Sequence, residues 1–195
     1  MTERPAGTLL AVEGVRKADL TLAAKKVLRR SGRPKTIAGI SLWDASGLFF
    51  ELSKEIRKQG YPSPKTLLML YAADLAFRLR WEIQPALDEG LVVAAAPYVE
   101  TALAFAAGAG VPSDWAAELF RFAPQPQAVY RVPDKRGPPS SKAKPAAGFL
   151  EFCCACLGAS AREWNPATVR AGFVEYLNRL EKAGKAGRLS AGGLG

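Results

Sequence analysis

Short apolar runs without polar alternation recur along this chain, and each is followed by a stretch in which apolar residues have helical spacing. These runs lie at residues 8–12, 36–40, 91–95 and 128–132. Strands of this kind are buried on both faces, and strands that alternate with helices pair in parallel. We therefore expect one three-layer α/β/α domain over residues 1–183, built on a parallel sheet of about five strands.

The turn after the first expected strand has the spacing of a phosphate-binding loop. Such loops read G-x-x-x-x-G-K-[ST], and their backbone N–H groups hold phosphate at a helix N-terminus. Gly14 and Thr21 stand at the first and last positions of this motif, whereas Asp19 and Leu20 replace its second glycine and its lysine. The frame of a nucleotide site is therefore present without its principal cation.

Asp19 belongs to a residue type that often caps helix N-termini. We expect its carboxylate to cap a helix over residues 19–30 and to repel a polyphosphate. Arg16 and Lys17 add positive charge on the loop, but not at the lysine position. Taken alone, this stretch favours an ordinary capped helix after a strand.

The composition excludes several chemistries. Among 195 residues there is no histidine, so imidazole bases and the nucleophile pairs that need them are absent. Cys153, Cys154 and Cys156 are spaced too closely for a usual zinc site, and buried thiols in a helix are expected instead. No apolar run is long enough to span a bilayer and the first residues do not form a signal peptide, so we expect a cytoplasmic protein.

Positive charge is concentrated near the N-terminus. The formal net charge is +9, and residues 16–35 hold eight basic residues and one acidic residue. A basic patch of this kind can attract nucleic acid. The cations at Lys25, Lys26, Arg29 and Arg30 also suit the C-terminal end of a helix. The absence of aromatic residues between them favours this second interpretation.

The longest expected helix starts at Ser63-Pro64 and ends near Glu89. Serine suits the N-cap, proline suits the first helical position, and Pro85 predicts a kink near the end. Residues 67–81 are apolar on nearly every face. Such a helix needs cover all round, so one side is expected to face the sheet. The other side is expected to form a dimer interface or to be roofed by neighbouring helices.

The remaining segments complete the pattern. Further helices are expected at residues 48–58, 98–107, 114–122, 149–157 and 165–182. Residues 131–147 are rich in proline, serine and basic residues, which predicts a flexible loop whose cations can reach a nucleotide or simply face solvent. Residues 184–195 are expected to be a disordered tail.

Three stretches in the middle of the chain resemble bacterial thymidylate kinase in order and spacing. They are Thr66–Asp74, Ile83–Val93 and Tyr98–Phe105, and Glu13-Gly14 is similar to the Glu-Gly that begins that family's phosphate-binding loop. The resemblance implies a P-loop kinase fold. It also implies transfer of a phosphoryl group from ATP to dTMP with magnesium, and dimers formed through the long helix.

The departures from that family fall on its functional positions. Leu20 replaces the lysine, Ala96-Pro97 replaces the Asp-Arg before Tyr98, and Leu75 replaces the arginine that contacts the dTMP phosphate. Phe105-Ala106 stands for the Tyr-Gln pair that reads thymine. Phosphoryl transfer depends on positioning and on charge stabilisation by lysine, arginine and magnesium, so the loss of these groups together favours an inactive protein.

The sequence therefore predicts a catalytically inactive thymidylate kinase-like protein, a binding or scaffold module without catalytic residues, bound metal or cofactor. Its vestigial nucleotide site comprises Gly14, Arg16, Lys17, Asp19 and Thr21, and its vestigial substrate side comprises Asp74, Tyr98, Glu100 and Phe105. We expect a homodimer through helix 64–89, with a protein partner as a further possibility. The alternatives are an active dTMP kinase that uses ATP and magnesium, and a basic accessory protein that binds nucleic acid.

Overall fold

The computed structural model describes residues 6–31, 36–133 and 148–160. The expected helix at 165–182, the expected tail and most of the basic loop lie outside these residues. Four parallel strands form the described sheet in the order β2-β3-β1-β4, with bounds β1 (Thr8–Glu13), β2 (Ile37–Leu42), β3 (Val92–Ala96) and β4 (Ala128–Arg131). Each of the four expected strands is present, within two residues of its expected ends.

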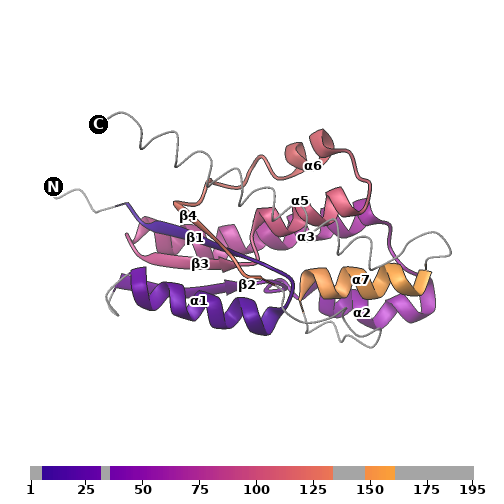
Figure 1. The fold of residues 1–195 in the computed structure, drawn as a ribbon, viewed down its shortest axis with the longest axis horizontal. Helices are drawn as coiled ribbons and strands as arrows, with labels where there is room; N and C mark the ends of the chain where they lie inside the picture. The colour runs from indigo at the N-terminus through magenta and orange to yellow at the C-terminus, as the bar shows by residue number, and fades with distance from the viewer. Residues whose placement is uncertain (1–5, 32–35, 134–147, 161–195) are drawn as a thin grey trace.

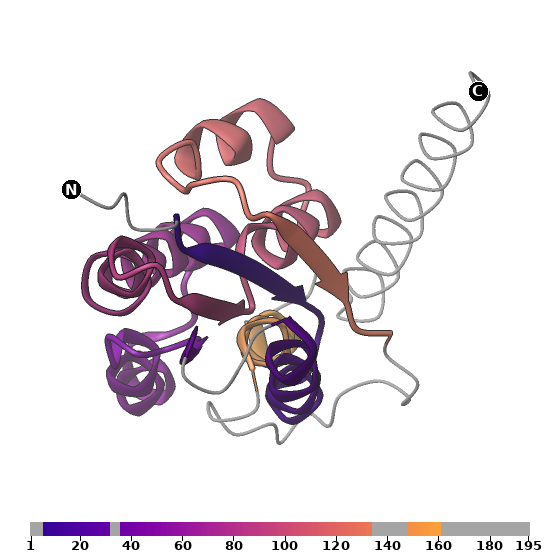
Figure 2. The same cartoon turned by 90° about the vertical axis from the view of Figure 1, so that its left-hand side faces the viewer.

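Helices cover both faces of this sheet, as Figures 1 and 2 show. On one face α1 (Lys17–Ser31) buries Leu20, Ala24, Val27 and Leu28 against β1 and β3. The opposite face is covered by α3 (Pro64–Arg78), α5 (Val99–Gly108) and α6 (Ser113–Leu119). The expected three-layer α/β/α arrangement is confirmed.

Two helix ends differ from the sequence-based expectation. Helix α1 begins at Lys17, so Asp19 lies inside its first turn instead of capping it. Residues 17 and 18, which were expected to belong to the loop, are part of the helix. Helix α6 ends at Leu119, three residues before its expected end at residue 122, and its N-cap is Pro112.

The long helix is divided into three segments. Ser63 caps α3 by accepting a hydrogen bond from the Thr66 N–H at 3.1 Å, as expected. A π-helical turn, η2 (Leu79–Ile83), then leads into α4 (Gln84–Asp88). Pro85 has no N–H to donate to the preceding turn. The backbone adjusts one residue earlier, where the Gln84 N–H donates to the Leu79 carbonyl.

An aromatic core joins α2 (Leu48–Gln59) and α7 (Phe149–Ser160) to the rest of the domain beyond one end of the sheet (Figure 1). Phe149 and Phe152 of α7 lie 5.8 Å and 5.4 Å, centroid to centroid, from the ring of Phe49. Phe149 also packs 4.3 Å from the ring of Tyr71 on α3. Within the described residues, no helix is long and apolar enough to cross a membrane.

Candidate functional site

The turn after β1 is shorter than a phosphate-binding loop. Because α1 begins at Lys17, the N–H of Leu20 donates to the Arg16 carbonyl at 2.9 Å, as in an ordinary helix. The hydroxyl of Thr21 donates to the Lys17 carbonyl at 2.7 Å. An amide that is used inside a helix cannot also hold phosphate. The hydroxyl of Thr21, the last residue of the motif, is therefore also used in a hydrogen bond within its own helix.

Leu20 fills the space beneath this turn. Its side chain is 1% exposed and belongs to the core between α1 and the sheet. A Cβ placed on Gly14 would lie 3.2 Å from Leu20 Cδ2 and 3.2 Å from the Cβ of Val132. The first glycine of the motif therefore serves close packing, and the lysine position has become part of the core.

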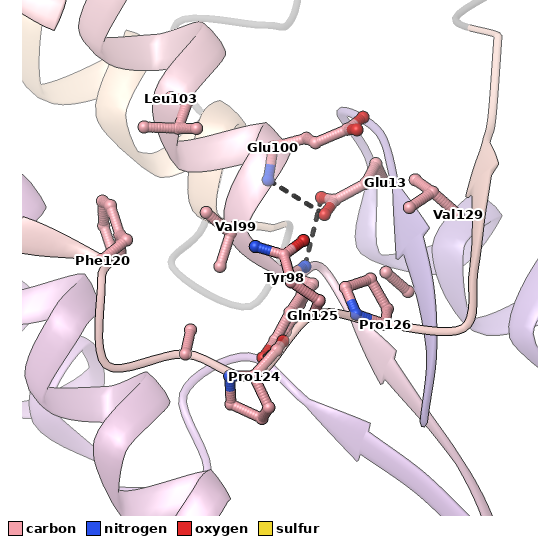
Figure 3. A pocket seen from close by; sticks show the side chains of 12 residues that line it. Glu13, Tyr98, Val99, Glu100, Leu103, Phe120, Pro124, Gln125, Pro126 and Val129 are labelled. Atoms are coloured by element: carbon pink, nitrogen blue, oxygen red, sulfur yellow. Dashed lines mark hydrogen bonds between the residues drawn. The ribbon is translucent and has the colours of Figure 1, made fainter. Parts of the chain in front are cut away.

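Glu13, at the end of β1, caps the N-terminus of α5 from a distant part of the chain. Its carboxylate accepts hydrogen bonds from the N–H groups of Tyr98, Glu100 and Thr101 at 3.1, 3.0 and 3.0 Å, and from the Thr101 hydroxyl. Figure 3 shows two of these bonds. Burial raises the pKa of the Glu13 carboxyl, although the donors around it act in the opposite direction. The N–H of Gly14 donates to the Thr101 hydroxyl, which closes this corner of the site.

Glu100 lies beside Glu13, but its carboxylate is hydrogen-bonded to β4. It accepts two hydrogen bonds from the Arg131 guanidinium, at 2.8 Å and 2.7 Å, so α5 is tied to β4. Arg131, which was expected both in the strand at 128–132 and at the start of the basic loop, is the last residue of β4. A cavity of about 240 Å³ opens between α5 and the segment that joins α6 to β4, and Glu13, Tyr98 and Glu100 line it (Figure 3).

Asp74 is fully buried and organises the turn before α2. Its carboxylate accepts hydrogen bonds from the N–H groups of Asp44 and Ser46 at 3.1 and 3.0 Å, and from the Ser46 hydroxyl at 2.7 Å. Asp44 in turn accepts from the N–H groups of Phe49 and Phe50. Asp74, expected to face a substrate, thus holds the start of a helix through its neighbours.

Arg78 links Asp74 to Tyr98 through the interior. Its Nε donates to Asp74 at 3.0 Å, and its Nη1 donates to the carbonyl of Pro97 at 2.9 Å. The hydroxyl of Tyr71 donates to the carbonyl of Tyr98 at 2.6 Å and lies 3.4 Å from Arg78 Nη2. The sequence reasoning missed Arg78. The i,i+4 spacing from Asp74 on a helix was the signal that could have found it.

The start of α7 lies directly on the turn after β1. A Cβ placed on Gly148 would lie 3.0 Å from the Val15 carbonyl oxygen and 3.0 Å from the Lys17 nitrogen, so these backbones are in close contact. Glu151, in the first turn of α7, accepts a hydrogen bond from Arg16 Nη1 at 2.9 Å. The backbone around the vestigial nucleotide site is therefore covered by the chain itself.

The other predicted site residues divide between surface and core. Asp19 is partly exposed in the first turn of α1, whereas the ring of Phe105 is fully buried, 5.6 Å from the ring of Phe149. Phe105 therefore belongs to the aromatic core. Within the described residues, the structure brings Glu13, Tyr98 and Glu100 together but places neither Asp74 nor Phe105 at the same cavity.

The cysteines of α7 are buried, as expected. Burial raises the pKa of the Cys156 thiol to about 12 and that of Cys153 well above its usual value, and neighbouring cysteines add to both shifts. No group of three or more His, Cys, Asp or Glu side chains in the described part of the chain is placed to hold a metal ion.

Four parallel strands in the order β2-β3-β1-β4, with helices on both faces and a helix directly after β1, are consistent with a P-loop kinase type of α/β/α fold. No family model matches the chain. It is 27% identical over 118 residues to the probable thymidylate kinase of Caldivirga maquilingensis, covering 60% of this chain and 57% of that protein. It is 29% identical over 118 residues to that of Pyrobaculum calidifontis, covering 60% and 59%.

The comparison with solved structures agrees with the sequence comparisons. The fold matches the crystal structure of thymidylate kinase from Ehrlichia chaffeensis with a TM-score of 0.57 at 15% identity, over 90% of this chain and 84% of that one. The chain is thus thymidylate kinase-like in sequence and in fold. Its matches span somewhat more than half the length of these two curated relatives.

Proposed function

We propose that this chain is a thymidylate kinase-like protein that does not transfer phosphate and acts in the cytoplasm as a dimeric binding or scaffold module. The observation that carries the proposal is the seating of α7 on the turn after β1, with Leu20 buried beneath that turn. A phosphate needs free N–H groups and a cation at this place. Here the backbone is packed against Gly148, and nucleotide binding is accordingly lost or weak.

The charges around the former site support the same conclusion. Three arginines at this end of the sheet are each paired with a carboxylate: Arg16 with Glu151, Arg78 with Asp74, and Arg131 with Glu100. Catalysis of phosphoryl transfer needs cations aimed at charge that develops on the moving group. An arginine already neutralised by an internal partner contributes little to that charge.

The exposed face of the long helix supports self-association. Met69 and Phe77 on α3 are 49% and 40% exposed, and Trp81 in the π-helical turn that follows is 65% exposed. Large exposed apolar side chains that follow one another along a helix in this way form an apolar stripe, which supports an interaction surface. A second copy of the same stripe would cover it in a symmetric dimer.

The catalytic part of the proposal is tested by calorimetric titration with ATP, ADP and dTMP, together with a coupled assay for ADP release in the presence of magnesium. We expect no turnover and no saturable heat at millimolar nucleotide. Measured turnover with dTMP that stays with the purified protein would overturn the proposal. Loss of that turnover in Arg16→Ala combined with Lys17→Ala would assign it to these two cations, and turnover that survives the substitution would direct the search to the basic residues of 131–147.

The dimer is tested separately by light scattering on size-exclusion fractions. Phe77→Glu with Trp81→Glu should convert a dimer into a monomer, because charge is placed at the centre of an apolar contact. Phe122→Glu is the matched control, since Phe122 is 48% exposed on a different part of the surface. A wild-type monomer at micromolar concentration, or a dimer that survives the double substitution, would contradict this interface.

A further inference from the structure

A groove of about 270 Å³ runs between α1 and the edge strand β4, away from the turn that α7 covers. Figure 2 shows β4 at the margin of the sheet, beside β1. Its lining combines apolar residues with basic and aromatic ones: Ala23, Val27, Val132 and Pro133, with Lys26, Arg30, Tyr130 and Arg131. The groove thus combines cations with an aromatic ring.

The local structure explains why these residues meet. Residues 23, 26, 27 and 30 have the i, i+3, i+4, i+7 spacing of one helix face. On β4, Ala128 and Val132 pack against the α1 core whereas Val129 packs against the opposite one. Alternation along a strand places Tyr130 on the same side as Ala128 and Val132. The Tyr130 side chain therefore stands on the side of the sheet that carries Lys26 and Arg30.

In the described structure, two of the three cations that line this groove, Lys26 and Arg30, have no acidic partner, whereas Arg131 is paired with Glu100. Lys25, Lys26, Arg29 and Arg30 are all exposed on α1. In the parts of the chain that the structure describes, none of the four has a carboxylate within ion-pair distance. Arg16, Arg78 and Arg131, by contrast, are each paired. Four cations without a carboxylate partner are thus gathered in the C-terminal half of α1.

We propose that the groove between α1 and β4 binds single-stranded nucleic acid. Lys26 and Arg30 contact consecutive phosphates, and a base stacks on the ring of Tyr130, which is 39% exposed. Proteins that bind single-stranded nucleic acid without sequence preference combine a positively charged groove with aromatic side chains on which bases stack. The sequence showed the cations without an aromatic partner. The fold supplies that partner from a strand far along the chain.

Single strands are favoured over duplexes for a geometric reason. A ring at the side of a shallow groove reaches the face of a base only when that base is unstacked from its neighbours. The proposal does not depend on the loss of catalysis at the turn after β1, because Lys26, Arg30 and Tyr130 are not part of that turn.

The test is fluorescence anisotropy of a labelled oligothymidylate with the full-length protein, over a series of salt concentrations. Lys26→Glu with Arg30→Glu removes two groove cations. Lys25→Glu with Arg29→Glu makes the same change in net charge on the same helix outside the groove. We expect the double substitution Lys26→Glu with Arg30→Glu to weaken binding at least about tenfold more than Lys25→Glu with Arg29→Glu. We also expect it to lower the salt slope by about 1.4, since each single-strand phosphate contributes about 0.7.

The stacking contact has its own matched pair of variants. Tyr130→Ala should weaken binding about fivefold or more while leaving the salt slope unchanged, because stacking releases no counterions. Tyr61→Ala is the control, since Tyr61 is 38% exposed but lies away from the groove. Circular dichroism of each variant verifies that the fold is retained.

Several results would overturn the proposal. Equal losses from the two charge-reversal pairs would show that net charge alone attracts the strand. Equal affinity for a duplex of the same length, or no effect of Tyr130→Ala, would exclude base stacking. Failure to bind the oligonucleotide at low salt, together with groove-dependent binding to anionic phospholipid vesicles, would assign the surface to a membrane instead.

Discussion

The buried pair of Asp74 and Arg78 offers the sharpest test of the internal network. Both side chains are 0% exposed, and their atoms are 3.0 Å apart. Arg78→Met keeps most of the side-chain length but removes the hydrogen bonds to Asp74, Pro97 and Tyr71. The Asp74 carboxylate then stays buried with its backbone and serine donors, but without a countercharge.

The expected loss of stability follows from that geometry. Removing one partner of a buried ion pair costs about 3–5 kcal/mol, because the remaining charge is uncompensated. For a chain of this size each kcal/mol lowers the melting temperature by about 2–4 °C. We therefore expect Arg78→Met to melt about 6–20 °C below the wild type.

The measurement is urea denaturation followed by circular dichroism, with calorimetry as a second method. Arg80→Met is the matched control, because Arg80 lies two residues further along the long helix and is exposed. It should change the free energy of unfolding by no more than about 0.5 kcal/mol. A loss below about 1 kcal/mol for Arg78→Met would refute the reasoning, since the pair would then be open to water in solution.

Three further perturbations test other parts of the structure. Gly148→Ala should destabilise the protein by about 1–3 kcal/mol in urea unfolding, because its Cβ would press on the turn after β1 and because its φ of +147° is unfavourable for alanine; an unchanged midpoint would mean that α7 is not seated there. Cys153 and Cys156 should resist alkylation at mildly alkaline pH until denaturant is added, because burial raises both pKa values; rapid labelling of the folded protein would contradict their placement. The Glu13 pKa is raised from 4.5, so its contribution to stability is full below that pH and is lost as pH rises through the folded value. The advantage of the wild type over Glu13→Gln should therefore shrink toward neutral pH, and a pH-independent difference would exclude the shift.

The sheet and its helices could be predicted because their signals are local. The apolar runs at 8–12 and 91–95 become β1 and β3 with small changes at their ends. Ser63 caps α3 as its spacing predicts. The start of α1 was wrong by two residues because capping propensity was weighed without the tertiary contacts. Burial of Leu20 and the contact with Gly148 favour an earlier helical turn.

The candidate site was harder to predict because its partners are far apart in the sequence. Glu13 bonds to residues 98–101, and Arg16 bonds to Glu151. No spacing rule connects positions separated by 85 or 135 residues. The substituted motif positions indicated that the site had changed. They did not indicate that α7 would cover it, because that depends on how the aromatic core packs.

The same packing sets a limit on any remaining nucleotide affinity. A phosphate at the turn after β1 requires α7 to move, which would expose Phe149 and Phe152, now 1% and 4% exposed. Exposing two such side chains costs about 3–6 kcal/mol, before the Arg16–Glu151 pair is counted. A ligand that binds only the opened form has its apparent affinity lowered by the fraction of molecules that are open, here about 10²- to 10⁴-fold. A nucleotide that would bind the exposed turn at micromolar concentration would therefore need roughly 0.1–10 mM to occupy it. The seating of α7 thus weakens nucleotide binding in addition to the missing lysine, and at the upper end of this range it alone prevents saturable binding at millimolar nucleotide.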